Sequence, residues 1–235
     1  LYANYYESYS INSGSNQIAF TGGGSGGGGS FGSLLPCGYY SVQDAEGNVY
    51  PTVQIGTQCW LKENMNIGTM IQGTSNQGTN CSSAASIQKY CYGNNSTNCD
   101  TYGGLYQWDQ AMCGTTTSLK GICPTGWHIP TDAEYKTLEI NLGCSTAEVD
   151  NTGWRCDGVG TQLKPDDGSG FEGLLAGYRN TDSSFDGLSS YGDFWSSSEG
   201  SASSAWRRLL SSGYSTVSRA PYPKAFGFSV RCLKD

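Results

Sequence analysis

The sequence has few charged residues, a single histidine and no long hydrophobic run. Charged residues make up 14% of the 235 residues, and the formal net charge is −7. A surface that binds nucleic-acid phosphates is basic, so the negative charge argues against a nucleic-acid partner. No hydrophobic run approaches the roughly 18 residues that a membrane span needs, so we expect no membrane span in this chain.

The cysteine pattern does not indicate a zinc site. Ten cysteines are present, but none form the tight C-x-x-C pairs or Cys/His clusters that hold zinc. An even number at wide spacings predicts up to five disulfides, and hence an extracellular or cell-surface location. Buried free thiols are the alternative. No signal peptide opens the printed sequence, so we expect it to begin after a removed signal peptide or a truncated membrane anchor.

Glycine, with 34 residues, and tyrosine, with 16, are prominent. This composition is poor in strong helix formers and rich in strand and turn formers, which predicts a loop-rich α+β or mostly β domain. Residues 1–20 are aromatic and weakly patterned, and could be the end of a stem helix or a strand that docks onto the domain. Residues 21–36 form a Gly/Ser-rich flexible linker, native or engineered. Residues 37–235 are the predicted folded domain.

Strand signals occur at both ends of this domain. Alternating hydrophobic residues over 49–55 follow a turn at residues 46–48 and predict a strand pair. Residues 68–86 are small and polar and predict a long loop. From Phe171 onward, Tyr- and Ser-rich segments with repeated glycine turns predict several antiparallel strands.

Helix signals lie between these strands. Thr131 and Glu134 have the spacing of a capping box, which predicts a helix that Gly143 ends. Apolar residues at helical spacing predict a second helix within 103–112. A further short helix is expected after Ser145.

The segment from Ala205 to Cys232 alternates between two kinds of side chain. Successive side chains of an extended chain point to opposite faces, so Trp206 and Arg208 would face one way, and Arg207 and Leu209 the other. We expect the first face to pack and the second to accept varied side chains at little cost in stability. A Tyr/Ser/Gly-rich surface is typical of binding surfaces. An ordinary solvated sheet face is the alternative.

Few residues suit catalysis. His128 lies between a tryptophan and an apolar-proline pair, which favours a structural role, and no G-x-S-x-G motif supplies a triad serine. The acids Asp150, Asp157, Asp166 and Asp167 are interpreted as solvated loop residues. They could bind structural Ca²⁺, which takes oxygen ligands, but we assign no metal site. The Glu-Pro-Asn and Trp-Asn-Asp signatures of Ca²⁺-dependent lectins are absent, so we assign no sugar site, no catalytic residue and no cofactor.

Six stretches of the domain together resemble one protein family. They are DAEGNVYPTVQIGTQCWLKENMN, GGLYQWDQAM, GICPTGWHIPTDAEYKTLE, LLAGYRN, FWSSSE and GFSVRCLKD. Over residues 37–235 the chain resembles the Fibrobacter succinogenes major paralogous domain, which is similar to the C-type-lectin-like fold and to formylglycine-generating enzymes. The resemblance implies an α+β, C-type-lectin-like fold with two or three helices and a mostly antiparallel, loop-rich sheet. It also implies a secreted or surface-anchored bacterial protein.

Some relatives of this family are variable proteins of diversity-generating retroelements, in which a C-terminal segment varies on a constant scaffold. The resemblance therefore implies scaffold roles for Trp195, Trp206, Arg208, Arg219 and Arg231. It implies a ligand-binding surface made of Arg207, Leu209, Ser211, Ser212, Tyr214, Ser218, Ala220, Pro221, Tyr222, Ala225 and Phe226.

The resemblance also implies a disulfide between Cys123 and Cys232. From their positions we expect the pairs Cys144–Cys156, Cys91–Cys99 and Cys37–Cys59, and Cys81–Cys113 then follows by elimination. The sequence alone allows other connectivities.

Three functions are compatible with the sequence. The first is a non-catalytic, extracellular ligand-binding or adhesion domain, whose partner is a protein or glycan on another cell or host surface. The second is the globular head of a type IV pilin-like subunit, with possible filament self-assembly. The third, an enzyme of formylglycine-generating type, requires free thiols.

Overall fold

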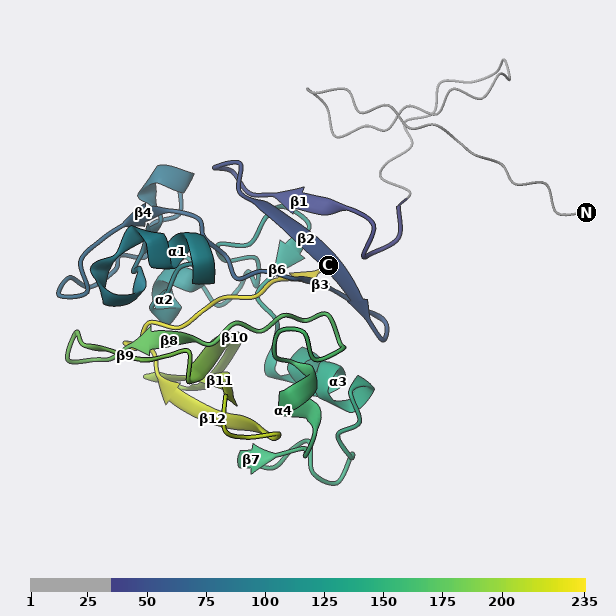
Figure 1. The fold of residues 1–235 in the computed structure, drawn as a ribbon. Coiled ribbons are helices and arrows are strands. Elements are labelled where there is room, and N and C mark those ends of the chain that lie inside the picture. The colour runs from purple at the N-terminus through teal and green to yellow at the C-terminus, as the bar shows by residue number, and fades with distance from the viewer. Residues whose placement is uncertain (1–34) are drawn as a thin grey trace, which may run out of the picture. The chain divides into compact units, whose positions relative to one another are not determined.

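The computed structural model describes residues 35–235, of which Cys37–Asp235 form one compact unit (Figure 1). The predicted segment 1–20 and most of the predicted linker 21–36 lie outside the described residues. The unit is α+β, with few helices and mostly antiparallel sheets. No helix in the described part of the chain has the length and apolar character of a membrane span.

The first sheet joins the two ends of the domain. Its strand order is β1-β2-β3-β13-β6, and every pairing is antiparallel. The strands are β1 (Ser41–Gln43), β2 (Val49–Ile55), β3 (Gln58–Leu61), β6 (Trp127–His128) and β13 (Leu233–Lys234). The predicted strand pair is therefore confirmed. Asp44 fixes its turn, because its carboxylate accepts hydrogen bonds from the backbone N–H groups of Glu46 and Asn48.

The second sheet holds most of the C-terminal third of the chain. Its strand order is β7-β12-β11-β10-β8-β9. The strands are β7 (Gly153–Arg155), β8 (Ala176–Arg179), β9 (Phe185–Leu188), β10 (Tyr191–Ser201), β11 (Ser204–Ser211) and β12 (Val217–Pro223). All pairings are antiparallel except that of β8 with β10, so the prediction of antiparallel strands after Phe171 is largely confirmed. A small parallel pair joins β4 (Thr69–Met70) to β5 (Gln88–Lys89).

The described residues form more helices than predicted, although only one is longer than two turns. The helices are α1 (Ser96–Tyr102), α2 (Trp108–Ala111), α3 (Asp132–Asn141) and α4 (Val159–Gln162), with 3₁₀ turns η1 (Ala84–Ser86) and η2 (Tyr92–Asn94). The predicted helix over 103–112 is only α2, because Leu105 and Tyr106 form β-bridges to Tyr90 and Phe228. The predicted short helix after Ser145 is wrong, since that segment forms only turns.

The helix α3 begins and ends where its sequence predicts. The Thr131 hydroxyl accepts the Glu134 N–H at 3.2 Å, and the Glu134 carboxylate accepts the Thr131 N–H at 2.7 Å. These bonds satisfy two of the backbone donors that a helix N-terminus leaves open. Gly143 takes a φ of +104° just beyond the end. Tyr135 and Leu138 on one face pack into a core shared with Leu210 and the second sheet.

All ten cysteines are paired. The disulfides are Cys37–Cys59, Cys81–Cys113, Cys91–Cys99, Cys123–Cys232 and Cys144–Cys156, the same five pairs that were expected. Cys123–Cys232 ties the C-terminus to the segment before α3, while the yellow C-terminal chain runs from β12 back to the first sheet (Figure 1). Cys123–Cys232 therefore links segments 109 residues apart, whereas Cys91–Cys99 and Cys144–Cys156 close local loops of 8 and 12 residues.

Candidate ligand-binding site

Strands β10, β11 and β12 lie side by side and present alternate residues to two faces. Leu209 is opposite Ser218 on β12 and Asp193 on β10, so these three share one face, called here the outer face. Arg208 is opposite Arg219 and Phe194, which share the inner face. The predicted alternation of this segment is therefore confirmed.

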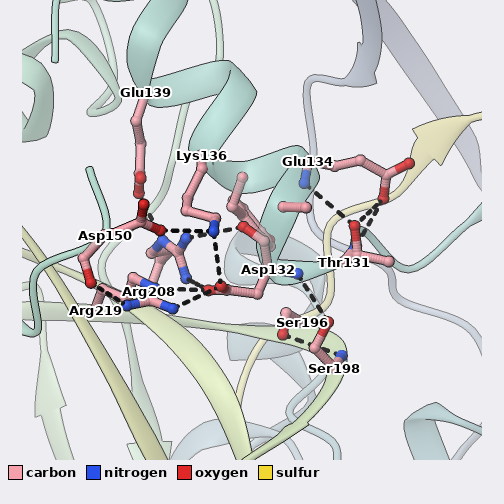
Figure 2. A network of polar contacts seen from close by, with 12 residues as sticks. Thr131, Asp132, Glu134, Lys136, Glu139, Asp150, Ser196, Ser198, Arg208 and Arg219 are labelled. Carbon is pink, nitrogen blue, oxygen red and sulfur yellow. Dashed lines mark hydrogen bonds and ion pairs between the residues drawn. The ribbon is translucent and has the colours of Figure 1, made fainter. Parts of the chain in front are cut away.

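A network of buried charges holds the inner face against α3 (Figure 2). Arg208 contacts Glu139 at 2.6 Å and Asp132 at 2.8 Å, and Arg219 contacts Asp132 at 2.7 Å. Arg155 of β7 reaches the second Glu139 oxygen at 2.6 Å. Both carboxylates thus have hydrogen-bonded cationic partners, the arrangement that makes buried charge tolerable.

The pKa of Asp132 reflects its ion pairs in this network. Burial alone would raise its pKa, but hydrogen bonds and charge from Arg219 and Arg208 outweigh burial and lower the pKa to about 2. The backbone N–H of Asp132 also donates to the Ser198 hydroxyl at 3.0 Å, which ties the first turn of α3 to β10 (Figure 2). The inner face is therefore fixed by several mutually dependent contacts.

Other residues to which the resemblance assigns scaffold roles lie at different depths. Trp195 is fully buried and donates its indole N–H to the Tyr106 carbonyl at 2.8 Å. Arg231 is also fully buried and donates to the carbonyls of Leu61, Phe171 and Glu172. Burial lowers the pKa of Arg231 to about 10. Trp206 is only partly buried, with the Arg219 guanidinium 3.9 Å from its ring centroid.

The outer face forms the base of a pocket of about 300 Å³. Its lining residues are Trp154, Tyr178, Tyr191, Asp193, Arg207, Leu209, Tyr214, Tyr222, Phe226 and Phe228. Five of them, Arg207, Leu209, Tyr214, Tyr222 and Phe226, belong to the binding surface that the resemblance implies. The pocket therefore gathers residues of that segment into one concave site.

An ion pair lies deep in this pocket. Arg207 Nε is 3.1 Å from Asp193 Oδ1, and both side chains are buried. The Arg207 guanidinium also stacks over Tyr222, 4.4 Å from the ring centroid. Burial raises the pKa of Asp193 to about 6, against the lowering effect of the Arg207 charge. The contact of Arg207 Nε with Asp193 is an ion pair without hydrogen-bond geometry, and Nη1 is buried with no hydrogen-bond partner among the described residues.

Aromatic rings form the rim and one wall of the pocket. Trp154 and Tyr214 stack with centroids 4.5 Å apart, and they are 39% and 52% exposed. Tyr222, Phe226 and Phe228 also line the pocket and pack with centroids 5.0–5.9 Å apart. The site thus combines a polar base with exposed aromatic surface, a common composition for ligand pockets.

The structure corrects the expectation that the whole outer face lies open. Arg207, Ser211 and Ser218 are buried. The rings of Tyr222 in β12 and of Phe228 lie against the Arg207 guanidinium, with their centroids 4.4 and 6.0 Å from its central carbon. Ser218 lies on β12, which is paired with β7 on one side and β11 on the other. The Ser211 hydroxyl accepts the Gly213 N–H in the turn that follows β11.

The other members of the implied surface do not line the pocket. Ser212, Pro221 and Ala225 are exposed outside it, and Ala220 is half-buried beside Arg207 in the sheet. Pro221 is opposite Trp206, and therefore lies on the inner-face side of β12. The implied surface is thus split between the pocket and its surroundings.

Five lining residues were missed from the sequence: Trp154, Tyr178, Tyr191, Asp193 and Phe228. Asp193 had a usable signal, since it is a single acid in the aromatic strand segment Tyr191–Trp195. Trp154 and Tyr178 reach the pocket from β7 and β8, so their places depend on the strand order of the sheet.

The remaining polar candidates lie elsewhere. His128 bridges Glu134 at 3.1 Å and Asp235 at 2.7 Å, and its pKa is raised chiefly by the hydrogen bond to Glu134. Within residues 35–235, no group of three or more His, Cys, Asp or Glu side chains is placed to hold a metal. A wider hollow of about 740 Å³ beside β2 and α1 has a mostly polar lining, which includes Asp166 and Glu172.

The fold and the pocket define a disulfide-bonded α+β domain with an aromatic, C-terminal candidate site. Residues 53–234 match the Fibrobacter succinogenes major domain, and the chain belongs to that family. No curated protein and no solved structure matches the chain.

Proposed function

We propose that this chain is a non-catalytic, extracellular ligand-binding or adhesion domain on a C-type-lectin-like scaffold, and that the aromatic pocket is its binding site. The observation that carries the proposal is the convergence of Arg207, Leu209, Tyr214, Tyr222 and Phe226 on one concave surface. The proposed partner is a protein or glycan on another cell or host surface.

Separation of the two sheet faces supports a role in binding. The inner-face arginines are committed to Asp132 and Glu139, whereas Leu209 on the outer face is only partly buried and Tyr214 at the pocket is 52% exposed. Side chains that make few buried contacts can change with little effect on stability. Such a division suits a domain whose binding surface differs between relatives on a constant scaffold.

The disulfides support an extracellular location, because disulfides persist in oxidising compartments. They also weigh against chemistry of the formylglycine-generating type, since all ten cysteines are paired. The pilin-like alternative depends on residues 1–20, which lie outside the described part of the chain.

Binding of the fluorescently labelled full chain to intact bacterial and host cells tests this proposal. The variant Tyr214→Ala removes an exposed pocket ring, and Tyr39→Ala, which removes a 77% exposed ring that does not line the pocket, is the matched control. We expect Tyr214→Ala to weaken cell binding and Tyr39→Ala to leave it unchanged. Absence of cell binding, or equal binding by both variants, would contradict the proposed site.

A further inference from the structure

The charge of the pocket restricts the ligand that it can accept. Asp193 and Arg207 are the only acidic and basic residues of its lining, and they contact each other at 3.1 Å. A cationic group placed here would be attracted by the ionised Asp193 but repelled by Arg207, and an anionic group the reverse, so neither gains a net attraction from the pair. Because the pair has no net charge when Asp193 is ionised, a neutral ligand is the best match.

The same pair can still hydrogen-bond to a ligand. Arg207 Nε faces Asp193 Oδ1 at 3.1 Å and Nη1 is buried, which leaves Nη2 as the guanidinium nitrogen that can meet a ligand acceptor. The carboxylate of Asp193 is an acceptor in the same place. A hydroxyl group can both donate and accept, so neighbouring hydroxyls on one ligand could satisfy Asp193 and Arg207 together.

The aromatic surface adds a requirement for an apolar face. Trp154, Tyr191 and Tyr214 expose between 38% and 52% of their surface at the rim. The volume of about 300 Å³ lies at the small end of the range for ligand pockets, so it suits one ring-sized unit. A pyranose ring has hydroxyls at its edge and C–H groups on its faces, and it is neutral in most sugars.

We propose that the pocket binds a neutral pyranose unit of a glycan, with its hydroxyls on Asp193 and Arg207 and a C–H face on the aromatic rim. This inference rests on the proposed function and names its ligand class. Recognition is independent of calcium, because Ca²⁺ takes six to eight oxygen ligands and the lining supplies a single carboxylate.

The test uses the full chain in the presence of EDTA. Immobilised neutral oligosaccharides and soluble methyl hexopyranosides are the probes, with sialylated and amino-sugar glycans and aromatic-rich peptides as comparators. Binding is measured by array and by calorimetry for wild type, Asp193→Asn, Tyr214→Ala and the control Tyr39→Ala. Tyr214 is exposed, so its variant keeps the test valid if Asp193→Asn fails to fold.

We expect neutral glycans to bind in EDTA, and loss of the Tyr214 ring to weaken binding by up to about tenfold. Asp193→Asn should weaken binding at neutral pH, and Tyr39→Ala should bind like wild type. Preference for charged glycans, a requirement for Ca²⁺, or neutral-glycan binding that Tyr214→Ala leaves unchanged would overturn the inference. Peptide or cell binding that depends on Tyr214, without any neutral-glycan binding, would overturn the glycan inference but not the proposed function. Absence of binding to cells, peptides and glycans would contradict both.

Discussion

Arg207 and Arg208 are consecutive in β11, yet their guanidinium groups form ion pairs on opposite faces of the sheet. Arg207 contacts Asp193 in the pocket, whereas Arg208 contacts Asp132 and Glu139 under α3. Because successive side chains of a strand point to opposite faces, Arg207 is a candidate ligand-contacting residue whereas Arg208 stabilises the packing of the sheet on α3.

Loss of these two arginines should have unequal effects on stability. Arg208→Met leaves two buried carboxylates short of a partner, and we expect it to lower the free energy of unfolding by about 3–5 kcal/mol. Arg207→Met leaves only Asp193, whose pKa of about 6 shows that it takes up a proton readily. We expect a loss of roughly 1–2 kcal/mol there. Urea unfolding of both variants gives the comparison, and an equal or reversed order would contradict the assignment of faces.

Lowering the pH should change the contributions of Asp132 and Asp193 to the free energy of unfolding in opposite directions. The folded pKa of Asp132 is about 2, below the ordinary 3.8, so its contribution to stability is present above pH 4 and is lost as the pH falls toward 2. The folded pKa of Asp193 is about 6, so the folded state binds this proton more tightly, and stability rises as the pH falls from 6 to 4. Unfolding free energies measured from pH 3 to 8 should show that Asp193→Asn lacks this rise. An unchanged pH profile in that variant would count against a buried, ionisable Asp193.

The cap of α3 should contribute measurably to stability. Thr131→Ala removes the hydroxyl that accepts the Glu134 N–H, and we expect a cost of about 1 kcal/mol. Thr137→Ala is the matched control, because Thr137 is exposed within the same helix. Thermal or urea unfolding should show little loss for the control. Similar losses in both variants would mean that the capping box is not the cause.

The disulfides should differ in their contributions according to loop length. Cys123–Cys232 spans 109 residues and Cys91–Cys99 spans 8. On the chain-entropy description, removing the first should cost about 5 kcal/mol and removing the second about 2–3 kcal/mol. Paired Cys→Ser variants, unfolded in urea, give the comparison. A thiol assay on the denatured, unreduced chain should find no free thiol.

Local sequence signals predicted some parts of the fold well. The helix α3 was found from Thr131 and Glu134, because a capping box is a local pattern with a defined spacing. The two faces of β11 were found because strand side chains alternate with a period of two. In contrast, α1 and α4 are only seven and four residues long, too short for a clear periodic signal.

The pocket could be predicted only in part. Alternation placed Arg207 and Leu209 on one face, but it could not reveal that Tyr222 and Phe228 lie against Arg207. Asp193 reaches the same site from the neighbouring strand, and which strands are neighbours is a property of the whole sheet. The ion pair at the base of the pocket therefore became visible only in three dimensions.

The most direct measurement is a single-site substitution scan of residues 205–226 that scores folding by resistance to protease, separately from binding. The pocket residues Leu209 and Tyr214 should tolerate most replacements, whereas Arg208, Leu210, Val217 and Arg219 should tolerate few. The opposite pattern, with folding lost at the pocket residues and retained at the residues that face α3, would contradict the division between a binding face and a structural face.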